Sequence, residues 1–209
     1  MDVAEAFLDE LANRGITSFL VRTKNYHIPL SSRGLYADHL QAAGMVSIHH
    51  NAPMIAPSSD PGAETFVQSN SVKSARLGTL VYEAVYEALD KFSWVQWTSQ
   101  YDAGVIRVLN NRGTDTYGMM SRPKTPTTLI ELAYLANPSE ARLLKSAEYL
   151  PAVVFSSPIC IRPFKKVPVV SIILDALIFL PELVVKPFIS FLENMNSITA
   201  VSYTHLRAH

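Results

Sequence analysis

One stretch of the sequence, residues 127–141, combines an apolar strand, a carboxylate and the start of a helix. Its first ten residues, TTLIELAYLA, are apolar and partly β-branched, which is typical of a strand inside a sheet. Asn137 can cap the helix, Pro138 suits its first turn, and Glu140 stands three residues after the cap. The stretch therefore predicts a strand that runs to the edge of a sheet and a helix that folds back.

Glu131 stands in the middle of this predicted strand. Glutamate is almost never fully buried unless it is paired or bound to a metal, so its position needs a reason. One reason is a functional site, because open α/β sheets build their sites at the carboxyl ends of strands. An ion pair with an arginine, or solvent at the strand end, explains the residue equally well.

Hydrophobic periodicity divides most of the chain into alternating helices and strands. The predicted helices span residues 2–14, 31–44, 72–92 and 138–150, with Ser31 or Ser32 capping the second of them. The predicted strands span residues 16–22, 45–48, 64–67 and 104–109, followed by the one that begins at residue 127. This alternation predicts an α/β fold with a twisted, mostly parallel sheet flanked by helices.

Composition excludes several classes of function. The chain has 209 residues, 48% of them apolar, which suits one large domain or one domain with an appendage. The formal net charge is zero, so nothing in the composition favours binding to nucleic acid. Cys160 is the single cysteine, which excludes an internal disulfide and a cysteine zinc site. The first residues have no basic start and no apolar segment, so they do not predict a signal peptide.

The character of the sequence changes near residue 155. We expect one domain over residues 1–155, an apolar proline-rich tail of doubtful origin over 156–200, and an adapter-derived scar over 201–209. Charges and prolines interrupt the tail, so it lacks the run of about 20 apolar residues that a membrane span needs. Contact of the tail with a membrane surface, or mistranslation of this region, stays open as an alternative.

His49 follows an apolar strand and precedes a second histidine, His50. Neutral imidazole is a common zinc ligand, although a histidine at a strand end is more often structural or solvated. Because His49 and Glu131 both lie near the carboxyl ends of predicted parallel strands, we expect both to face one cleft. His50 is expected to be a solvated neighbour at the lip of that cleft.

Three motifs in this order resemble the zinc-dependent N-acetylmuramoyl-L-alanine amidases, which are catalytic domains of bacterial cell-wall hydrolases. They are residues 47–52 (SIHHNA), 62–66 (GAETF) and 129–140 (LIELAYLANPSE), within a resemblance that covers about residues 3–150. The resemblance implies zinc as cofactor, peptidoglycan as partner, and an extracellular, periplasmic or cell-wall location. The reaction it implies is hydrolysis of the amide between N-acetylmuramic acid and L-alanine by zinc-activated water.

The resemblance also implies roles for individual residues. His49 matches the second histidine ligand of zinc, and Glu131 matches the catalytic glutamate, which acts as general base. Glu64, Arg33 and Arg112 are candidates for contact with the substrate, with exposed ion pairing as the alternative.

The sequence departs from the family pattern at its beginning. The family opens with a strand and a His-x-Gly-His-Gly loop, whereas this chain begins inside the helix that follows, so the first strand and two zinc ligands are missing. The chain as written is therefore expected to be N-terminally truncated, weakly metal-binding, unstable and inactive. A non-catalytic α/β module that binds peptidoglycan or a partner is the second hypothesis.

Overall fold

The computed structural model describes residues 17–24, 26–52, 57–98 and 104–149, the single positions 8 and 12, and the backbone of residues 171–175 and 202–203. The helix predicted over residues 2–14 lies outside the described residues, apart from those two positions. Most of the predicted tail and scar lie outside them as well, so the boundaries at residues 155 and 200 stay predictions.

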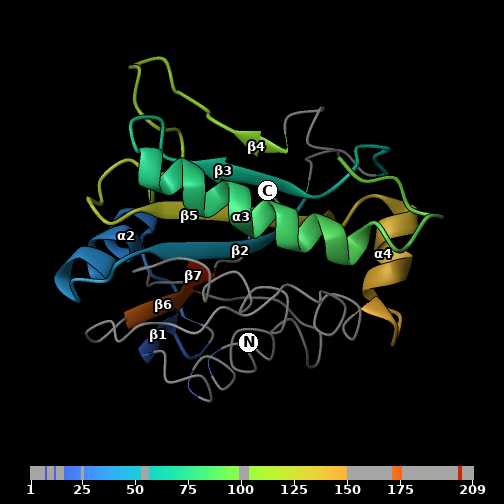
Figure 1. The fold of residues 1–209 in the computed structure, drawn as a ribbon, viewed down its shortest axis with the longest axis horizontal. Helices are drawn as coiled ribbons and strands as arrows, with labels where there is room; N and C mark the ends of the chain where they lie inside the picture. The colour runs from blue at the N-terminus through green and yellow to red at the C-terminus, as the bar shows by residue number, and fades with distance from the viewer. Residues whose placement is uncertain are drawn as a thin grey trace.

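The described strands form one sheet (Figure 1). In chain order the strands are β1 (Thr17–Arg22), β2 (Met45–Asn51), β3 (Glu64–Val67), β4 (Val105–Ile106), β5 (Thr127–Tyr134), β6 (Ser171–Asp175) and β7 (Ser202–Tyr203). Their order across the sheet is β1-β6-β2-β5-β3-β4, with β7 pairing with β2. The pairs are parallel except β3 and β5, which are antiparallel. The predicted α/β class with a mostly parallel sheet is confirmed.

Three described helices accompany the sheet: α2 (Leu30–His39), α3 (Val72–Leu89) and α4 (Pro138–Leu144). Figure 1 shows α3 lying across one face of the sheet, over β3, β5 and β2. A Cβ at Gly78 of α3 would come within 2.2 Å of Val67 and 2.9 Å of Thr128, so α3 packs closely on this face. None of the described helices is long and apolar enough to cross a membrane.

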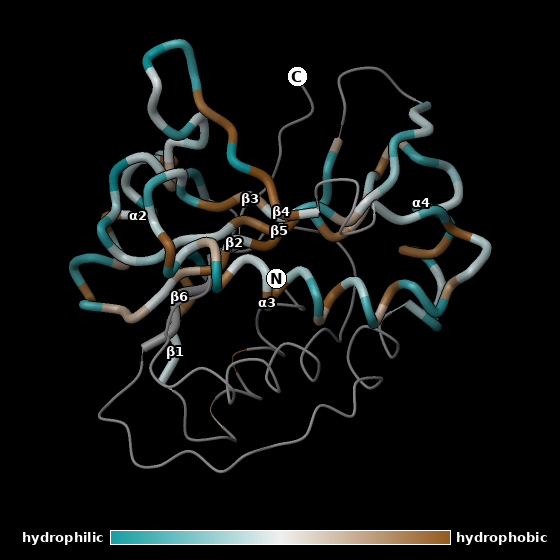
Figure 2. The backbone as a smooth tube through the Cα atoms, turned by 45° about the horizontal axis from the view of Figure 1, so that its top comes forward, coloured by the Kyte–Doolittle hydropathy of each residue, from teal (hydrophilic) through white to brown (hydrophobic). Residues whose placement is uncertain are grey.

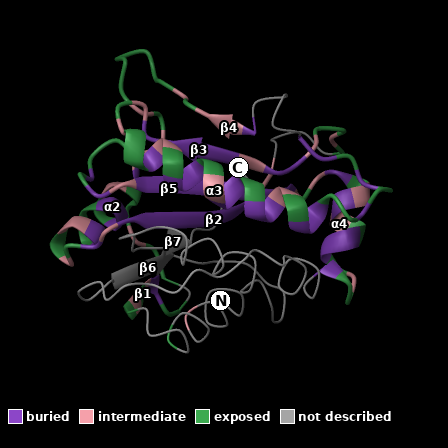
Figure 3. Ribbon diagram, viewed as in Figure 1, coloured by how far each residue is buried: buried purple, intermediate pink, exposed green. Residues whose placement is uncertain are grey.

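The other face carries a second apolar cluster, built from β1, α2, β2, β3, β5 and the loop that follows β4. Its buried members are Val21, Ala37, Ala42, Met45, Phe66, Met119, Met120 and Leu129. The central strands β2, β3 and β5 are largely buried (Figure 3). Figure 2 shows hydrophobic residues, in brown, along these strands in the middle of the fold. The core therefore lies on both faces of the three strands that carry the candidate residues.

Several predicted boundaries differ from the structure. Helix α2 begins at Leu30, and its N-cap, Pro29, makes no side-chain hydrogen bond, so the predicted serine cap is wrong. Strand β2 extends past Ile48 to Asn51 because its ladder with β5 continues to that point. Helices α2, α3 and α4 end earlier than predicted, and β4 is only two residues long.

Candidate functional site

Three neighbouring strands bring His49, Glu131 and Glu64 into one row across the sheet, toward the carboxyl ends of β2 and β5. His49 of β2 pairs in parallel register with Glu131 of β5, and Glu64 of β3 pairs with Glu131 across the antiparallel ladder. Residues directly opposite each other on neighbouring strands project on the same face. His49 and Glu131, which the sequence placed at one cleft, are therefore neighbours. Their predicted roles are a separate matter and stay predictions.

Glu131 is a buried acid, and hydrogen bonds from the described part of the chain do not satisfy both of its carboxylate oxygens. Its side chain is 3% exposed, and within the described residues its Oε2 atom has no hydrogen-bond partner. Burial raises the pKa of the Glu131 carboxyl well above its usual value, and the charge of Glu64 raises it further. Such a carboxyl holds its proton closer to neutral pH, which suits a group that both accepts and returns a proton.

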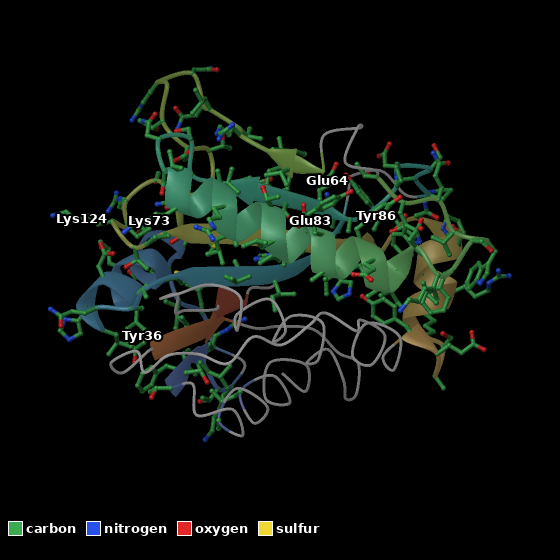
Figure 4. The ribbon with its side chains drawn as sticks, viewed as in Figure 1. Tyr36, Glu64, Lys73, Glu83, Tyr86 and Lys124 are labelled. Atoms are coloured by element: carbon green, nitrogen blue, oxygen red, sulfur yellow. The ribbon has the colours of Figure 1, made fainter. Side chains whose placement is uncertain are left out.

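Glu64 is half-buried and is the first residue of β3 (Figure 4). Its Oε2 atom accepts hydrogen bonds from Asn51 Nδ2 of β2 and from the hydroxyl of Tyr134 of β5, each at 3.3 Å. Burial raises the pKa of the Glu64 carboxyl, and these two hydrogen bonds offset part of that rise. Because it remains partly exposed, Glu64 is the carboxylate of the row that a solute reaches more easily.

His49 and His50 point to opposite faces of β2, as successive residues of a strand do. His49 Nε2 lies 2.9 Å from Ser47 Oγ, and the two residues share the face that carries Glu131. His50 is buried rather than solvated, so that expectation is wrong. Its Nε2 lies 3.5 Å from the Tyr149 hydroxyl, and burial lowers the His50 pKa to about 4. A neutral core histidine is the simplest account of His50.

Glu140 links the row to the rest of the fold, a role that its sequence position did not reveal. Its carboxylate accepts from the backbone N–H of Gly62 at 2.9 Å and of Tyr134 at 2.5 Å. The predicted Asn137 cap is confirmed, because Asn137 Oδ1 accepts from the backbone N–H groups of Ser139 and Glu140, whereas the Glu140 side chain bonds outside α4. Glu140 therefore fastens the segment before β3 to the end of β5, which sets Glu64 opposite Glu131.

Tyr117 is a second residue near the row that the sequence did not single out. It belongs to the loop between β4 and β5, and its ring packs on Phe66 with centroids 4.9 Å apart. Burial raises the Tyr117 pKa to about 12, helped by the charges of Glu131 and Glu64. A lone tyrosine in a polar loop has no pattern that would have identified it.

The two candidate arginines lie on other elements. Arg33 is buried in α2, where its Nε donates to the Ile28 carbonyl at 2.8 Å. Arg112 is exposed in the loop after β4. Contact of either with a substrate stays a prediction.

Comparison with known proteins identifies the family to which this chain belongs. The sequence profile described as N-acetylmuramoyl-L-alanine amidase matches residues 1–155, which is well over half of the chain. The chain belongs to this amidase family. The predicted resemblance is confirmed, and the row of His49, Glu131 and Glu64 lies within the matched residues. No curated protein matches the sequence.

Solved amidase structures share the fold. An N-acetylmuramoyl-L-alanine amidase from Clostridium difficile 630 has 24% identity and a TM-score of 0.52, with 69% of this chain and 72% of that chain covered. The catalytic domain of CwlV from Bacillus (Paenibacillus) polymyxa var. colistinus has 22% identity and a TM-score of 0.54, with 70% and 71% covered. Cwp6 from Clostridium difficile has 21% identity and a TM-score of 0.58. The match covers 70% of this chain and 22% of the Cwp6 chain.

The resemblance implies a zinc ion, which needs at least three side-chain ligands close together. Among the residues that the structure describes, no three His, Cys, Asp or Glu side chains come close enough together to hold a metal ion. His49 Nε2 also lies at hydrogen-bond distance from Ser47 Oγ. The described residues therefore do not fit a zinc site, and we assign no catalytic step to a metal.

Proposed function

We propose that this chain is the catalytic part of a peptidoglycan hydrolase that cuts the amide between N-acetylmuramic acid and L-alanine. The observation that carries this proposal is Glu131, a buried carboxyl with a raised pKa at the strand edge of an amidase-family fold. Peptidoglycan lies outside the cytoplasmic membrane, so we propose an extracellular, periplasmic or cell-wall location for the protein.

Glu131 is proposed to move the proton in this reaction. A carboxylate there takes a proton from the attacking water and, as a carboxylic acid, returns it to the leaving amine. Its raised pKa favours the second step at neutral pH, because the proton stays on the carboxyl long enough to be transferred. Glu64, at the exposed side of the row, is proposed to contact the substrate.

Zinc held by His49 stays a prediction of the resemblance and is not part of this proposal, because the described residues do not fit a metal site. Because the described residues do not form a metal site, we expect little hydrolysis from the isolated chain, as the sequence also predicted. Equilibrium dialysis against zinc measures this directly: wild-type protein and the His49→Ala variant are expected to retain similar small amounts of the metal. Stoichiometric zinc that is lost in the variant would overturn the expectation of weak metal binding.

The proposed substrate and reaction are tested together with purified peptidoglycan. After long incubation, mass spectrometry is expected to show a trace of stem peptides with a new L-alanine amino terminus, and Glu131→Gln is expected to abolish it. Glu83→Gln, on the exposed side of α3 (Figure 4), is the matched control and should leave the trace unchanged. Release that persists in Glu131→Gln would contradict the role of Glu131.

The second candidate is a module that binds peptidoglycan without cutting it. The absence of a metal cluster among the described residues is the observation that favours it. Sedimentation of the protein with insoluble peptidoglycan, without any released peptide that depends on Glu131, would favour this module. Absence of both binding and release would overturn both functions.

A further inference from the structure

Strand β1 is joined to the sheet through β6, a segment from far along the chain. The two strands run parallel, with Thr17 level with Ser171, Phe19 with Ile173, and Arg22 with Asp175. Among the strands that the structure describes, β6 is the one that forms a ladder with β1. The position of β1 in the sheet therefore depends on residues about 150 positions later in the sequence.

Strand β6 also pairs with β2, so it lies inside the sheet rather than at its margin (Figure 1). Leu174 is level with Val46 of β2, again in parallel. The opposite edge of β2 is fully used, because β5 pairs with it from Met45 to Asn51. Strand β6 thus lies between β1 and β2, and β7 pairs with β2 at the two positions that follow, Ser47 and Ile48.

The sequence of β6 suits an interior strand. It reads SIILD, an apolar, β-branched run of the kind found in parallel strands that are covered on both faces. Without it, the edge of β1 that pairs with β6 would present a row of unpaired N–H and C=O groups. Those groups would lie beside Val21 and Arg22, which are buried at 7% and 4% exposure.

We propose that residues 171–175 are a built-in closing strand, which holds β1 in the sheet beside β2, the strand that carries His49. The occupant of the position between β1 and β2 is this chain's own segment. Because β1, β6 and β2 are parallel, their carboxyl ends point toward the end of the sheet where His49 lies. Asp175 is level with Arg22 and one residue beyond the Leu174–Val46 pair, so the closing strand ends about level with Ser47, two residues before His49.

Hydrogen exchange on the full-length chain tests this inference without any need for activity. Amides of residues 171–175 are expected to exchange roughly tenfold or more slowly than in an unstructured peptide. In dilute denaturant, these amides and those of Thr17–Arg22 are expected to open together as one unit, before the β2–β5 ladder opens. Unprotected amides at 171–175, or β1 amides that stay protected after 171–175 have opened, would overturn the proposal.

A pair of substitutions at one position sharpens the test. Ile173→Pro removes an N–H and cannot sit in an interior strand, so exchange in Thr17–Arg22 is expected to accelerate at least roughly tenfold while the β2–β5 ladder keeps its protection. Ile173→Val keeps the N–H and the β-branched shape, and is expected to leave both unchanged. Unchanged exchange of β1 in Ile173→Pro would contradict the proposal.

The source of the strand is tested by concentration and by truncation. Protection at 171–175 is expected to be the same over a wide range of protein concentrations and in a monomer on size-exclusion chromatography. It is also expected to survive removal of residues 201–209, although β7 pairs with β2 at Ser47 and Ile48. Protection confined to a dimer would show that a second copy supplies the strand, and loss of protection on truncation would show that β6 does not hold β1 in the sheet by itself.

Discussion

Glu64 lies directly opposite Glu131 in the antiparallel ladder between β3 and β5. Two carboxylates in such positions disfavour each other's charged form, and the buried one feels this most. The Glu131 pKa is raised first by burial and then by Glu64. The charge of Glu64 therefore affects the pKa of Glu131, and this effect can be measured.

Replacing Glu64 is expected to lower the pKa of Glu131. In Glu64→Gln the neighbouring negative charge is gone, so the charged form of Glu131 becomes easier to reach. A pH titration of the Glu131 carboxyl carbon by NMR, in wild type and variant, measures the change. Glu83→Gln, at an exposed position of α3, is the control and should not change the Glu131 pKa. An unchanged or higher Glu131 pKa in Glu64→Gln would mean that the two carboxylates do not interact.

The stability that Glu140 contributes is expected to fall as pH rises from about 4.5 to about 7. Burial raises the Glu140 pKa from 4.5 to about 7, although backbone hydrogen bonds from Tyr134 and Gly62 act in the opposite direction. A raised folded-state pKa contributes stability that is complete below the unfolded value and is lost as pH passes the folded value. Glu131 acts in the same direction. Urea unfolding of wild type and Glu140→Gln at a series of pH values isolates this slope, because His50, whose lowered pKa gives the opposite slope, is present in both proteins.

The Glu140→Gln variant separates the two contributions. It should reduce the pH slope without removing it, because Glu131 still titrates. It should also destabilise the protein by about 1–3 kcal/mol, since an amide NH₂ replaces one of two oxygens that accept backbone N–H groups. A variant with the full wild-type slope would contradict the assignment of this titration to Glu140.

Gly34→Ala is expected to destabilise the protein although alanine favours helices. A Cβ at Gly34 would come within 2.4 Å of the Met119 carbonyl oxygen and 2.7 Å of Pro123, and a backbone atom cannot easily move aside. We expect a loss of about 1–3 kcal/mol, typical of overpacking. Gly118→Ala is the matched control, because its nearest neighbour would be 3.5 Å away, at Leu30. Equal melting temperatures for the two variants would argue against the close packing of α2 on this loop.

Asp38 joins the end of α2 to the segment that leads into β5. Its carboxylate accepts from the backbone N–H groups of Lys124 and Thr125 and from the Thr125 hydroxyl, at 2.7 to 2.9 Å. Burial alone would raise the Asp38 pKa, but these hydrogen bonds and the Lys124 charge lower it overall. The stability it contributes is present above pH 3.8 and lost as pH falls below that value.

Asp38→Asn is therefore expected to lower the free energy of unfolding by about 1 kcal/mol at pH 7. The difference from wild type should shrink below pH 3.8, where the wild-type carboxyl is itself protonated. Urea unfolding at pH 7 and pH 3 measures both values. A difference that grows at low pH would contradict the role given to the Asp38 carboxylate.

Local sequence patterns predicted the central part of the fold well. The apolar runs around Ile48 and Ile130 specify β2 and β5, and the Asn137-Pro138 pair specifies the start of α4, because each depends on neighbours in sequence. Parallel pairing of these strands predicts that His49 and Glu131 lie toward the same end of the sheet, and the structure adds the register that sets them side by side. The strands and their shared end of the sheet, but not the register, could therefore be inferred from sequence patterns alone.

Other parts depend on contacts between distant segments. Glu140 bonds to Gly62, 78 residues earlier, and no spacing rule predicts such a link. The burial of His50 depends on packing against Tyr149, 99 residues later, and so its predicted solvation was wrong. The place of residues 171–175 inside the sheet is likewise a long-range pairing, which a change of composition along the chain cannot reveal.

The most direct test of the proposed site is to locate a peptidoglycan fragment on the protein. Titration of the labelled full-length chain with N-acetylmuramoyl-L-alanyl-D-isoglutamine, followed by NMR chemical-shift mapping, places the ligand without requiring turnover. We expect saturable shifts at the carboxyl ends of β2 and β5 and at Glu64, around His49 and Glu131. Shifts confined to the α3 face, or no saturable shift at millimolar ligand, would contradict the proposed site.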